Sequence, residues 1–414
     1  MENSRIKISV NEREQVMEKK VGMVIGASQD AVHTIKKAQQ QGIYVVALDG
    51  NPHAGGLDYA DEGRVVDITD MQKVCLEVER IKPDFILPVP IGRYLITMGY
   101  VNEKYKLQGA MYEATKYSTD KYLFHYKLNE YGLRSTYEYI VNKQQGVKNL
   151  ELFYPAIMKP RFGSGSRDIF YIENEEQLQS AYCTIAGKNE DFILERFVEG
   201  VEYGVDGAVI DGKLYITLLR KKNMTPLPQR QAIAYTAVSR NTENEHLFYR
   251  IEKYLKSTTD ALEYDNCHFQ VDLIVNENEL FAVEMAPRPT GHSVHDIFVP
   301  MVTGLDLAEE YIKFLMGREY TFEAQNIRCL RICYFYFEPG VLKKIPELQN
   351  LKENADIVMW NCNLKEEDTL EKVINGHTIM GRGFFIIQGK NEQELEEKNQ
   401  WILSKFKVEI VDKK

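Results

Sequence analysis

Apolar runs alternate with short polar turns over the first hundred residues, in the order strand, helix, strand. The runs VGMVIGA, IYVVALD, RVVDI and DFILPVP resemble buried strands, and SQDAVHTIKKAQQQG between the first two has helical spacing. This alternation predicts an open parallel α/β sheet in residues 21–117. Because such sheets bind ligands at the carboxyl ends of their strands, we expect Gly26, Asp49, Asn51 and the loop 88–93 on a binding rim.

The rim lacks the pattern of a dinucleotide site. Only one glycine of GxGxxG follows the first strand, in the letters GASQDA, which argues against a bound NAD. Arg93 on the same rim is a candidate for holding a substrate carboxylate or phosphate. The alternative is an arginine that is paired at the surface.

The middle of the chain predicts a different kind of sheet. Ser118, Thr119 and Asp120 form an N-cap for a helix in KYLFHYKLNEYG, with Gly132 near its end. After residue 154 the short runs YPAIMKP, RDIFYI, DFILERFV, EYGVDGAVI and KLYITLL are separated by turn residues, which is typical of antiparallel strands. The segments EEQLQSAYCTIAG and HLFYRIEKYLKSTTDAL are predicted helices.

The two ends of the chain are expected to be smaller parts. Residues 318–414 combine the β-rich runs LRICYFYFEP and GFFIIQG with the amphipathic helix NEQELEEKNQWILSKF, and predict a small α+β segment. Its aromatic run Tyr334 to Phe337 either packs in a core, caps a ligand site or forms a dimer surface, and core packing is the default. Residues 1–20 are polar, lack the apolar centre of a signal peptide and are expected to be an N-terminal extension.

Composition narrows the class of partner. A chain of 414 residues predicts two or three subdomains, and a net charge of −10 argues against nucleic acid or anionic membrane as the main partner. The six cysteines are scattered without a CxxC pair, which predicts reduced thiols in the cytoplasm. No apolar run reaches the length of a membrane span. Composition sets no oligomeric state, so a homo-oligomer stays open.

A hairpin near residue 280 carries the first candidate chemistry. In QVDLIVNENELFAVEMAPRP, a turn centred on Asn278 places Asp272 opposite Glu284 and Gln270 opposite Ala286. Two facing carboxylates lie about 4.5–5.5 Å apart at Cβ and repel one another unless a cation lies between them. Oxygen ligands of this kind suit Mg²⁺. The alternative is an exposed hairpin whose polar face is only solvated.

Other residues share this face. Arg288 and His268 point the same way in that register, and His292 follows shortly after. His268 and His292 are candidates for contacting the substrate, although histidines near polar clefts often only form structural hydrogen bonds.

A loop after a predicted strand offers a phosphate site. Lys159 ends an apolar run and is followed by PRFGSGS, with Gly163, Ser164, Gly165 and Ser166. Small residues let backbone N–H groups approach phosphate oxygens, and the lysine at the strand end neutralises them. A flexible hairpin turn with an extended lysine explains the same letters.

Two further segments are less specific. The run ILERFVEGVEY has the form of a hinge strand that offers backbone groups to a purine edge and a carboxylate to ribose hydroxyls, although Glu195 and Glu202 can also simply face solvent. The stretch RKKNMTPLPQR, residues 220–230, interrupts the strand pattern and is interpreted either as a lid over the site or as a surface loop.

Taken in order, these motifs resemble a known family. The letters TDK at residues 119–121, IMKPRFGSGS, ILERFVEGVEY and QVDLIVNENELFAVEMAPRP closely resemble the ATP-grasp superfamily of carboxylate-amine ligases, from about Val21 to Gly317. The resemblance implies an ATP-grasp fold: an N-terminal parallel α/β domain in residues 21–117, an α+β ATP-grasp domain in 118–317 with a lid subdomain at about 150–205, and the C-terminal segment.

The resemblance also implies roles for the motif residues. ATP would be bound by two lysines at the phosphates, a glycine-rich flap, adenine contacts and a ribose carboxylate: Lys121, Lys159, Gly163, Ser164, Gly165, Ser166, Glu195, Phe197, Val198 and Glu202. Asp272 and Glu284 would hold Mg²⁺ or Mn²⁺, and Arg288 with Lys159 would be the catalytic residues.

One position departs from the family pattern. Many members have asparagine where this chain has Ala286, and the string EMAPRPTGH is similar instead to carboxyaminoimidazole ribonucleotide synthetases. Gln270, water or substrate oxygens would then complete the metal site.

The function that the resemblance implies is ATP-dependent ligation. A small carboxylic or amino acid is activated as an acyl phosphate and joined to an amine, with release of ADP and phosphate. The letters VPMVTGLDLAEEYIKFLMG after Arg288 favour the amino-acid ligases. The alternatives are a carboxylase similar to carboxyaminoimidazole ribonucleotide synthetase and a non-catalytic nucleotide-binding protein.

Overall fold

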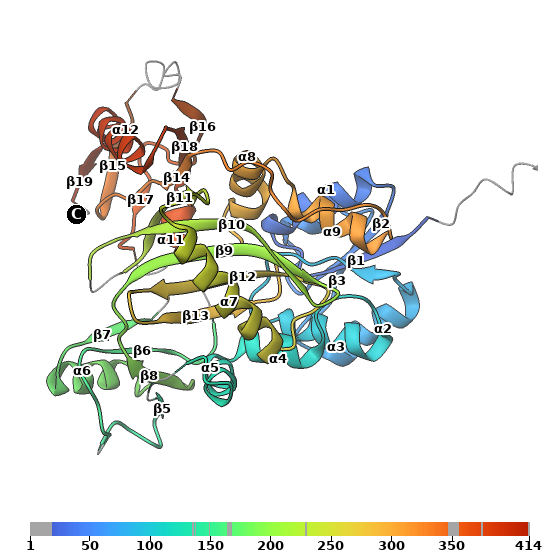
Figure 1. The fold of residues 1–414 in the computed structure, drawn as a ribbon, viewed down its shortest axis with the longest axis horizontal. Helices are drawn as coiled ribbons and strands as arrows, with labels where there is room; N and C mark the ends of the chain where they lie inside the picture. Colours follow the sequence, from blue (N-terminus) through green and yellow to red (C-terminus); the bar gives the residue numbers. More distant parts are fainter. Residues whose placement is uncertain are drawn as a thin grey trace, which may run out of the picture.

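The computed structural model describes residues 19–134, 136, 138–148, 150–163, 168–227, 230–346, 356–373 and 376–412. Ser164, Gly165 and Ser166 of the predicted flap lie outside this part. The described residues form three sheets that bear on the cavity described below and a fourth, small one near the C-terminus (Figure 1). None of the described helices combines the length and apolar character needed to cross a bilayer.

The N-terminal sheet is parallel, as predicted, with the strand order β3-β2-β1-β4. Its strands are β1 (Val21–Ile25), β2 (Tyr44–Asp49), β3 (Glu62–Val65) and β4 (Phe85–Ile86), and its helices are α1 (Val32–Gln40), α2 (Met71–Ile81), α3 (Leu95–Tyr105) and α4 (Tyr112–Thr119). Gly26 ends β1 with a φ of 93°, which glycine adopts readily. The turn that it makes brings the Ala27 N–H to the Asp49 carboxylate at 2.8 Å, so Asp49 holds the rim of the sheet together.

A small antiparallel sheet follows, with the order β5-β8-β6-β7. It consists of β5 (Glu138–Val141), β6 (Ala156–Pro160), β7 (Phe170–Ile172) and β8 (Phe192–Arg196), with α6 (Glu175–Ile185) packed on it. Helix α5 (Lys121–Glu130) precedes the sheet. The predicted cap is present, because the Asp120 carboxylate accepts the N–H groups of Tyr122 and Leu123.

The large sheet has eight strands in the order β13-β12-β9-β10-β11-β14-β18-β16. They are β9 (Val201–Ile210), β10 (Lys213–Met224), β11 (Ala232–Val238), β12 (Cys267–Val275), β13 (Leu280–Ala286), β14 (Leu330–Tyr334), β16 (Ile357–Cys362) and β18 (Gly383–Gln388). The helices between them are α7 (Glu245–Ala261), a π-helical turn (Val294–Phe298), α8 (Val299–Thr303) and α9 (Leu307–Leu315). The strand β11 lies within residues 232–238, where the apolar pattern had predicted none.

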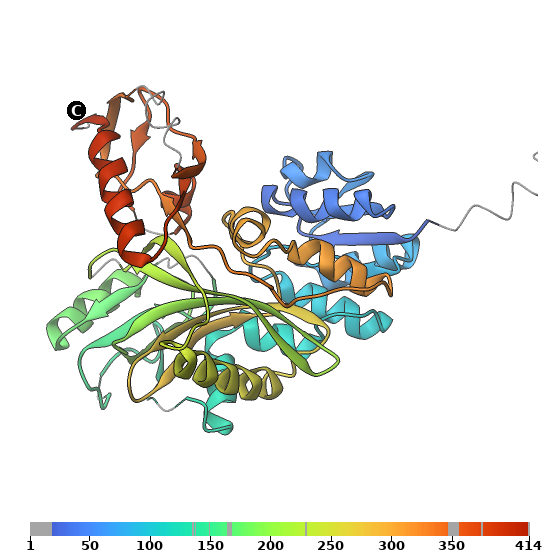
Figure 2. The same cartoon turned by 45° about the horizontal axis from the view of Figure 1, so that its top comes forward.

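The C-terminal residues join this sheet and do not stand apart. Strands β14, β18 and β16 extend it beyond β11, while β15 (Gly340–Lys344), β17 (Thr369–Leu370) and β19 (Glu409–Val411) form the fourth sheet beside α11 (Gly376–Met380) and α12 (Glu392–Lys405). Tyr334 and Phe335 of the aromatic run are buried, which confirms core packing. In Figure 2 this segment and the N-terminal sheet rise from the same side of the large sheet.

Packing ties the parallel sheet to the large one. A single buried apolar cluster runs from Val24 and Leu48 of the N-terminal sheet to Val205 and Val271 of the large sheet. The rim of the first sheet is therefore held in a fixed position against the predicted hairpin.

Candidate active site

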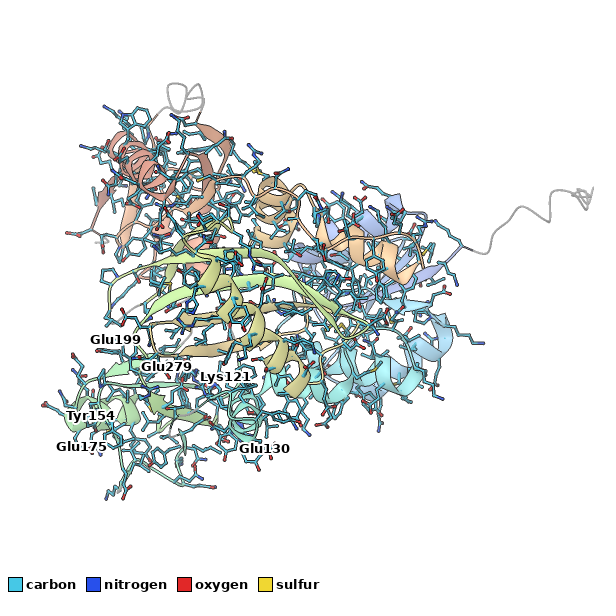
Figure 3. All side chains as sticks on the ribbon, in the orientation of Figure 1. Lys121, Glu130, Tyr154, Glu175, Glu199 and Glu279 are labelled. Atoms are coloured by element: carbon cyan, nitrogen blue, oxygen red, sulfur yellow. The ribbon has the colours of Figure 1, made fainter. Side chains whose placement is uncertain are left out.

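A cavity of about 310 Å³ lies where the small sheet, the large sheet and the N-terminal rim meet. Figure 3 shows Lys121, Glu199 and Glu279 between the large sheet and the small one. Most of the predicted site residues line the cavity: Lys121, Lys159, Gly163, Glu195, Phe197, Val198, Glu202, Gln270, Asp272, Glu284, Arg288 and His292. Of the rim, Pro90, Ile91 and Gly92 reach it, whereas Gly26, Asp49 and Asn51 do not line it.

The hairpin has the predicted carboxylate pair but a different turn. Strands β12 and β13 pair Asp272 with Glu284 and Gln270 with Ala286. Val275 pairs with Leu280, so the turn centres between residues 277 and 278 and not on Asn278. A β-bulge at residue 283 supplies the extra residue that returns Glu284 to the position opposite Asp272.

The oxygen groups of the hairpin fit a hard divalent cation. Gln270, Asp272 and Glu284 all line the cavity, and Glu284 has no hydrogen bond or ion pair to any other described residue. Asp272 forms an ion pair with Lys222, whose ammonium is buried. An ammonium beside Asp272 indicates that this position attracts positive charge, and carboxylate and amide oxygens are ligands that Mg²⁺ accepts. A bound cation would share Asp272 with Lys222.

Lys222 is a residue that the sequence reading missed. The segment RKKNMTPLPQR was expected to interrupt the strands, but β10 continues to Met224 and only the residues after it form a turn. Alternation along the strand then directs Arg220, Lys222 and Met224 into the cavity. The apolar pattern failed here because a strand that borders a charged cavity presents charged residues on one face.

Two lysines from α5 and the small sheet also line the cavity. Lys121 opens α5 and donates to the carbonyl of Gly163 at 2.6 Å, and Lys159 ends β6. Arg161 donates to both Asp120 carboxylate oxygens, at 2.8 and 2.6 Å, and so ties the loop after β6 to the start of α5. Desolvation lowers the pKa of Lys121, while the nearby Glu284 carboxylate opposes that shift.

Glu195 is engaged by the protein itself and is not free to contact adenine. Its carboxylate is 2.5 Å from the Lys159 ammonium and also pairs with Arg134, and its side chain is buried. Desolvation alone would raise the pKa of Glu195, but Lys159 and Arg134 hold it below its ordinary value. Glu195 therefore fixes the position of Lys159, which is a different role from the predicted adenine contact.

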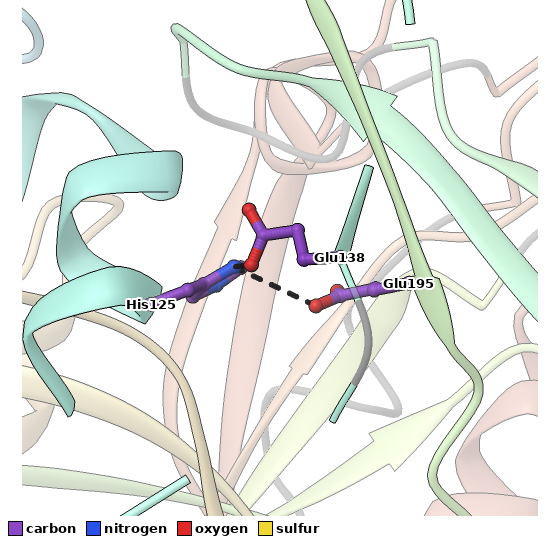
Figure 4. Close-up of side chains that lie close together, drawn as sticks. All are labelled: His125, Glu138 and Glu195. Atoms are coloured by element: carbon purple, nitrogen blue, oxygen red, sulfur yellow. Dashed lines mark hydrogen bonds and ion pairs between the residues drawn. The ribbon is translucent and has the colours of Figure 1, made fainter. Parts of the chain in front are cut away.

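Behind Glu195 lies a second layer of buried groups. His125 from α5 and Glu138 from β5 meet at 2.7 Å, with Glu195 3.6 Å from the same histidine nitrogen (Figure 4). Desolvation, together with the Glu195 charge, raises the pKa of Glu138 to about 8. Desolvation and the Arg134 charge lower the pKa of His125 well below its ordinary value. Nothing in the sequence pattern pointed to this layer, because its members are far apart along the chain.

In the segment that follows β8, some of the groups predicted to bind ATP already form contacts within the protein. The Phe197 N–H donates to the Pro155 carbonyl at 3.0 Å, and Tyr171 packs edge-on against the Phe197 ring. Val198 is buried, and its backbone groups make no hydrogen bond elsewhere in the described part of the chain. Glu202 pairs with Arg230, whose guanidinium lies 4.9 Å from the centre of the Phe197 ring. Among the described residues, the Val198 backbone and the Phe197 carbonyl are the predicted adenine contacts that no other group of the protein engages.

Three predicted substrate residues have different positions. His292 lines the cavity. Arg93 is exposed, lies over the Tyr94 ring and borders an adjoining recess that it shares with Gln270 and Arg288. His268 does not line the cavity: it is buried against Tyr311 and donates to the Leu307 carbonyl at 2.9 Å. Desolvation lowers the pKa of His268 to about 4, as expected for a neutral structural histidine.

Comparison with known proteins finds a domain family and several relatives. The ATP-grasp domain family matches residues 152–296. The L-arginine-specific L-amino acid ligase of Bacillus subtilis is 20% identical over 339 residues, which cover 79% of this chain and 81% of that protein.

Solved structures share the fold over nearly the whole chain. An L-amino acid ligase from Bacillus licheniformis has a TM-score of 0.79 at 16% identity, covering 96% of this chain and 99% of the other. An N5-carboxyaminoimidazole ribonucleotide synthetase from Thermotoga maritima has a TM-score of 0.70 at 20% identity, covering 95% and 100%. At these identities the likeness is one of fold.

Proposed function

We propose that this protein, which carries an ATP-grasp domain, is an ATP-dependent ligase that joins a small carboxylic or amino acid to an amine. A carboxylate oxygen attacks the γ-phosphate of ATP and ADP leaves. The amine nitrogen then attacks the acyl carbon, and phosphate leaves as the amide bond forms. The substrates are small molecules, and ATP with Mg²⁺ or Mn²⁺ is the energy source.

The facing pair Asp272 and Glu284 carries this proposal. It shares one cavity with the cations Lys121, Lys159 and Arg288. Phosphoryl transfer depends mainly on positioning and charge neutralisation, so carboxylates for a metal and cations for phosphate oxygens are sufficient equipment. A solvated hairpin face would not need three cations around it.

The remaining residues have roles that follow from their contacts. Lys159 is held by Glu195 and Lys121 by the start of α5, which directs both ammonium groups at the phosphate end. Asp272 and Glu284, with Gln270, would hold Mg²⁺ or Mn²⁺, which supplies neutralisation of phosphate oxygens. Among the described residues the Arg288 guanidinium donates only to the Pro289 carbonyl, at 2.7 Å, so its other N–H groups are available for the transferred phosphate.

The proposal is tested by searching for a product in a mixture of candidate substrates. Purified protein is mixed with Mg-ATP, the twenty amino acids, short carboxylic acids and simple amines, and ADP release and new masses are followed. The proposal expects ADP and a product equal to a carboxylate plus an amine less one water. Nucleotide binding without ADP release from any pool would contradict it.

One observation favours a second candidate. Ala286 stands opposite Gln270 where the hairpin ends, and the chain shares its fold with a carboxyaminoimidazole ribonucleotide synthetase. The second candidate is therefore an ATP-dependent carboxylase, in which bicarbonate replaces the carboxylic acid. ADP release that needs both bicarbonate and aminoimidazole ribonucleotide would select it over the amide ligase.

We place this activity in the cytoplasm. All six cysteines are free thiols in the structure, which suits a reducing compartment. The acidic net charge gives no reason to expect nucleic acid or a membrane surface as a partner.

A further inference from the structure

The far end of the cavity is closed by the N-terminal rim. After Arg288 the chain passes through Gly291, where an added Cβ would lie 3.1 Å from Oδ2 of Asp30 and 3.6 Å from Cβ of Pro90. Asp30 and Pro90 both line the cavity. The absence of a side chain at Gly291 therefore lets the Asp30 carboxylate reach across the backbone and face the volume beside Arg288.

Most of the other cations that line the cavity already have a carboxylate partner. Arg220 is bound to Asp206 at 2.7 Å, Lys222 pairs with Asp272, and Arg230 pairs with Glu202. In each of these pairs a carboxylate of the protein neutralises the cation.

Asp30 and Arg288 differ from these pairs, because neither has a partner of opposite charge in an ion pair within the described part of the chain. Asp30 has no hydrogen bond or ion pair to the described residues, and Arg288 has no carboxylate partner among them. Desolvation lowers the pKa of Arg288, and Glu284, Asp272 and Asp30 all oppose that shift. Glu284 is also unpaired among these residues and lies near Arg288, but it stands on the hairpin opposite Asp272, where a metal would use it. Asp30 is thus the unpaired carboxylate near Arg288 that does not belong to the hairpin, and it is close enough for the two charges to interact.

We propose that Asp30 binds the α-ammonium group of the acyl substrate, so that the acid activated here is an α-amino acid. This inference rests on the proposed ligase function. In an α-amino acid the ammonium is one carbon away from the carboxylate. A substrate whose carboxylate lies at Arg288 therefore presents its ammonium to a neighbouring anion, and Asp30 is the anion at that position.

The same charge would exclude simple carboxylic acids. A substrate without the amino group removes water from Asp30 and gives it no partner, and a carboxylate that loses water without gaining a partner is destabilised. The acceptor amine is a less suitable partner for Asp30, because an amine must be uncharged to attack and gains little from being held as an ammonium.

Binding measurements test the role of Asp30 without requiring turnover. The protein is saturated with Mg²⁺ and a non-hydrolysable ATP analogue, and calorimetry measures the affinity for each α-amino acid and for the acid of the same chain without the amino group. The wild type is expected to bind its preferred amino acid roughly 10- to 100-fold more tightly than the desamino acid. Asp30→Asn keeps the size of the side chain and should abolish this preference.

The matched control is Asp58→Asn, an exposed aspartate of the same domain that does not line the cavity. It should retain the wild-type preference. The inference is overturned if Asp30→Asn keeps the preference, or if the wild type binds nucleotide but no amino acid more tightly than its desamino counterpart. Failure of the ligase proposal has a different signature, namely amino acid binding that depends on Asp30 without ADP release.

Discussion

Of two carboxylates in the cavity, one is paired within the protein and the other is not. This difference determines whether removing each of them affects folding or catalysis. Glu195 is bound by Lys159 and Arg134, whereas Glu284 has no partner within the described residues. Removing Glu195 would leave two buried cations without their counter-charge, which costs about 3–5 kcal/mol for a buried pair. The Glu284 side chain forms no hydrogen bond or ion pair with the described residues, so its loss should be seen in chemistry and not in folding.

Glu284→Gln is the variant that separates these effects. It should lower kcat/KM by roughly 10²- to 10³-fold, because a metal ligand and its charge are lost at the phosphate end. The melting temperature should change by less than about 2 °C. Steady-state ADP release and thermal unfolding measure the two. Glu277→Gln, in the exposed turn of the same hairpin, is the control and should change neither.

A pH effect follows from Glu138. Its pKa of about 8 in the folded protein lies far above the ordinary value of about 4.3, because burial and Glu195 disfavour its charge. The folded state therefore keeps a proton that the unfolded chain releases. The stabilisation from this group is complete below about pH 4 and is lost as the pH rises through 8.

Glu138→Gln should remove this dependence. Relative to the variant, the wild type should lose on the order of a few kcal/mol of unfolding free energy between pH 5 and pH 8. Urea unfolding of both proteins at several pH values gives the difference. A difference that stays constant over this range would show that Glu138 is already ionised in the folded state.

At the residue scale, the sequence predicted which residues line the cavity better than it predicted what each of them contacts. Asp272, Glu284, Lys159 and Arg288 stand in local motifs, so their letters were sufficient. The partners of Glu195 were not predictable, because Arg134 and His125 reach it across long stretches of chain and only the folded packing brings them together.

At the scale of elements, the hairpin and β10 differ from the sequence prediction for different physical reasons. Asp272 and Glu284 were predicted to face one another from a turn that the structure does not have, and the bulge at residue 283 compensates for the difference. Bulges are not visible in alternating patterns, since one extra residue only shifts the phase. The apolar pattern predicts only the first half of β10, because the second half is charged. Lys222 lies in this second half and was therefore not predicted to face the cavity.

Because side chains alternate along β10, its two neighbouring lysines point to opposite faces and can serve as a test variant and its control. Lys222 faces the cavity and Asp272, whereas Lys221 pairs with Glu392 of α12 at 2.7 Å. Lys222→Met should tighten Mg²⁺ binding without nucleotide by roughly tenfold, because Asp272 no longer shares its charge with an ammonium. Lys221→Met should leave it unchanged. Calorimetric titration with Mg²⁺ decides, and equal affinities in both variants would mean that Asp272 is not a metal ligand.

At the scale of the whole molecule, the strand order explains why one cavity collects residues from the whole chain. The parallel sheet supplies the rim, the small sheet supplies Lys159, and the large sheet supplies the hairpin. Even the C-terminal part contributes, since Met380 of α11 lines the cavity. The sequence did not predict that β14, β16 and β18 would continue the large sheet, because strand pairing over such distances leaves no local signal.

Isotope transfer tests most directly whether a substrate carboxylate is activated by phosphoryl transfer. The substrate found in the pool is prepared with ¹⁸O in both carboxylate oxygens and turned over with Mg-ATP and the amine. An acyl phosphate route moves one labelled oxygen to the released phosphate and leaves one in the amide, so mass spectrometry should find singly labelled phosphate. Phosphate without label, with both labelled oxygens still on the acid, would contradict the account.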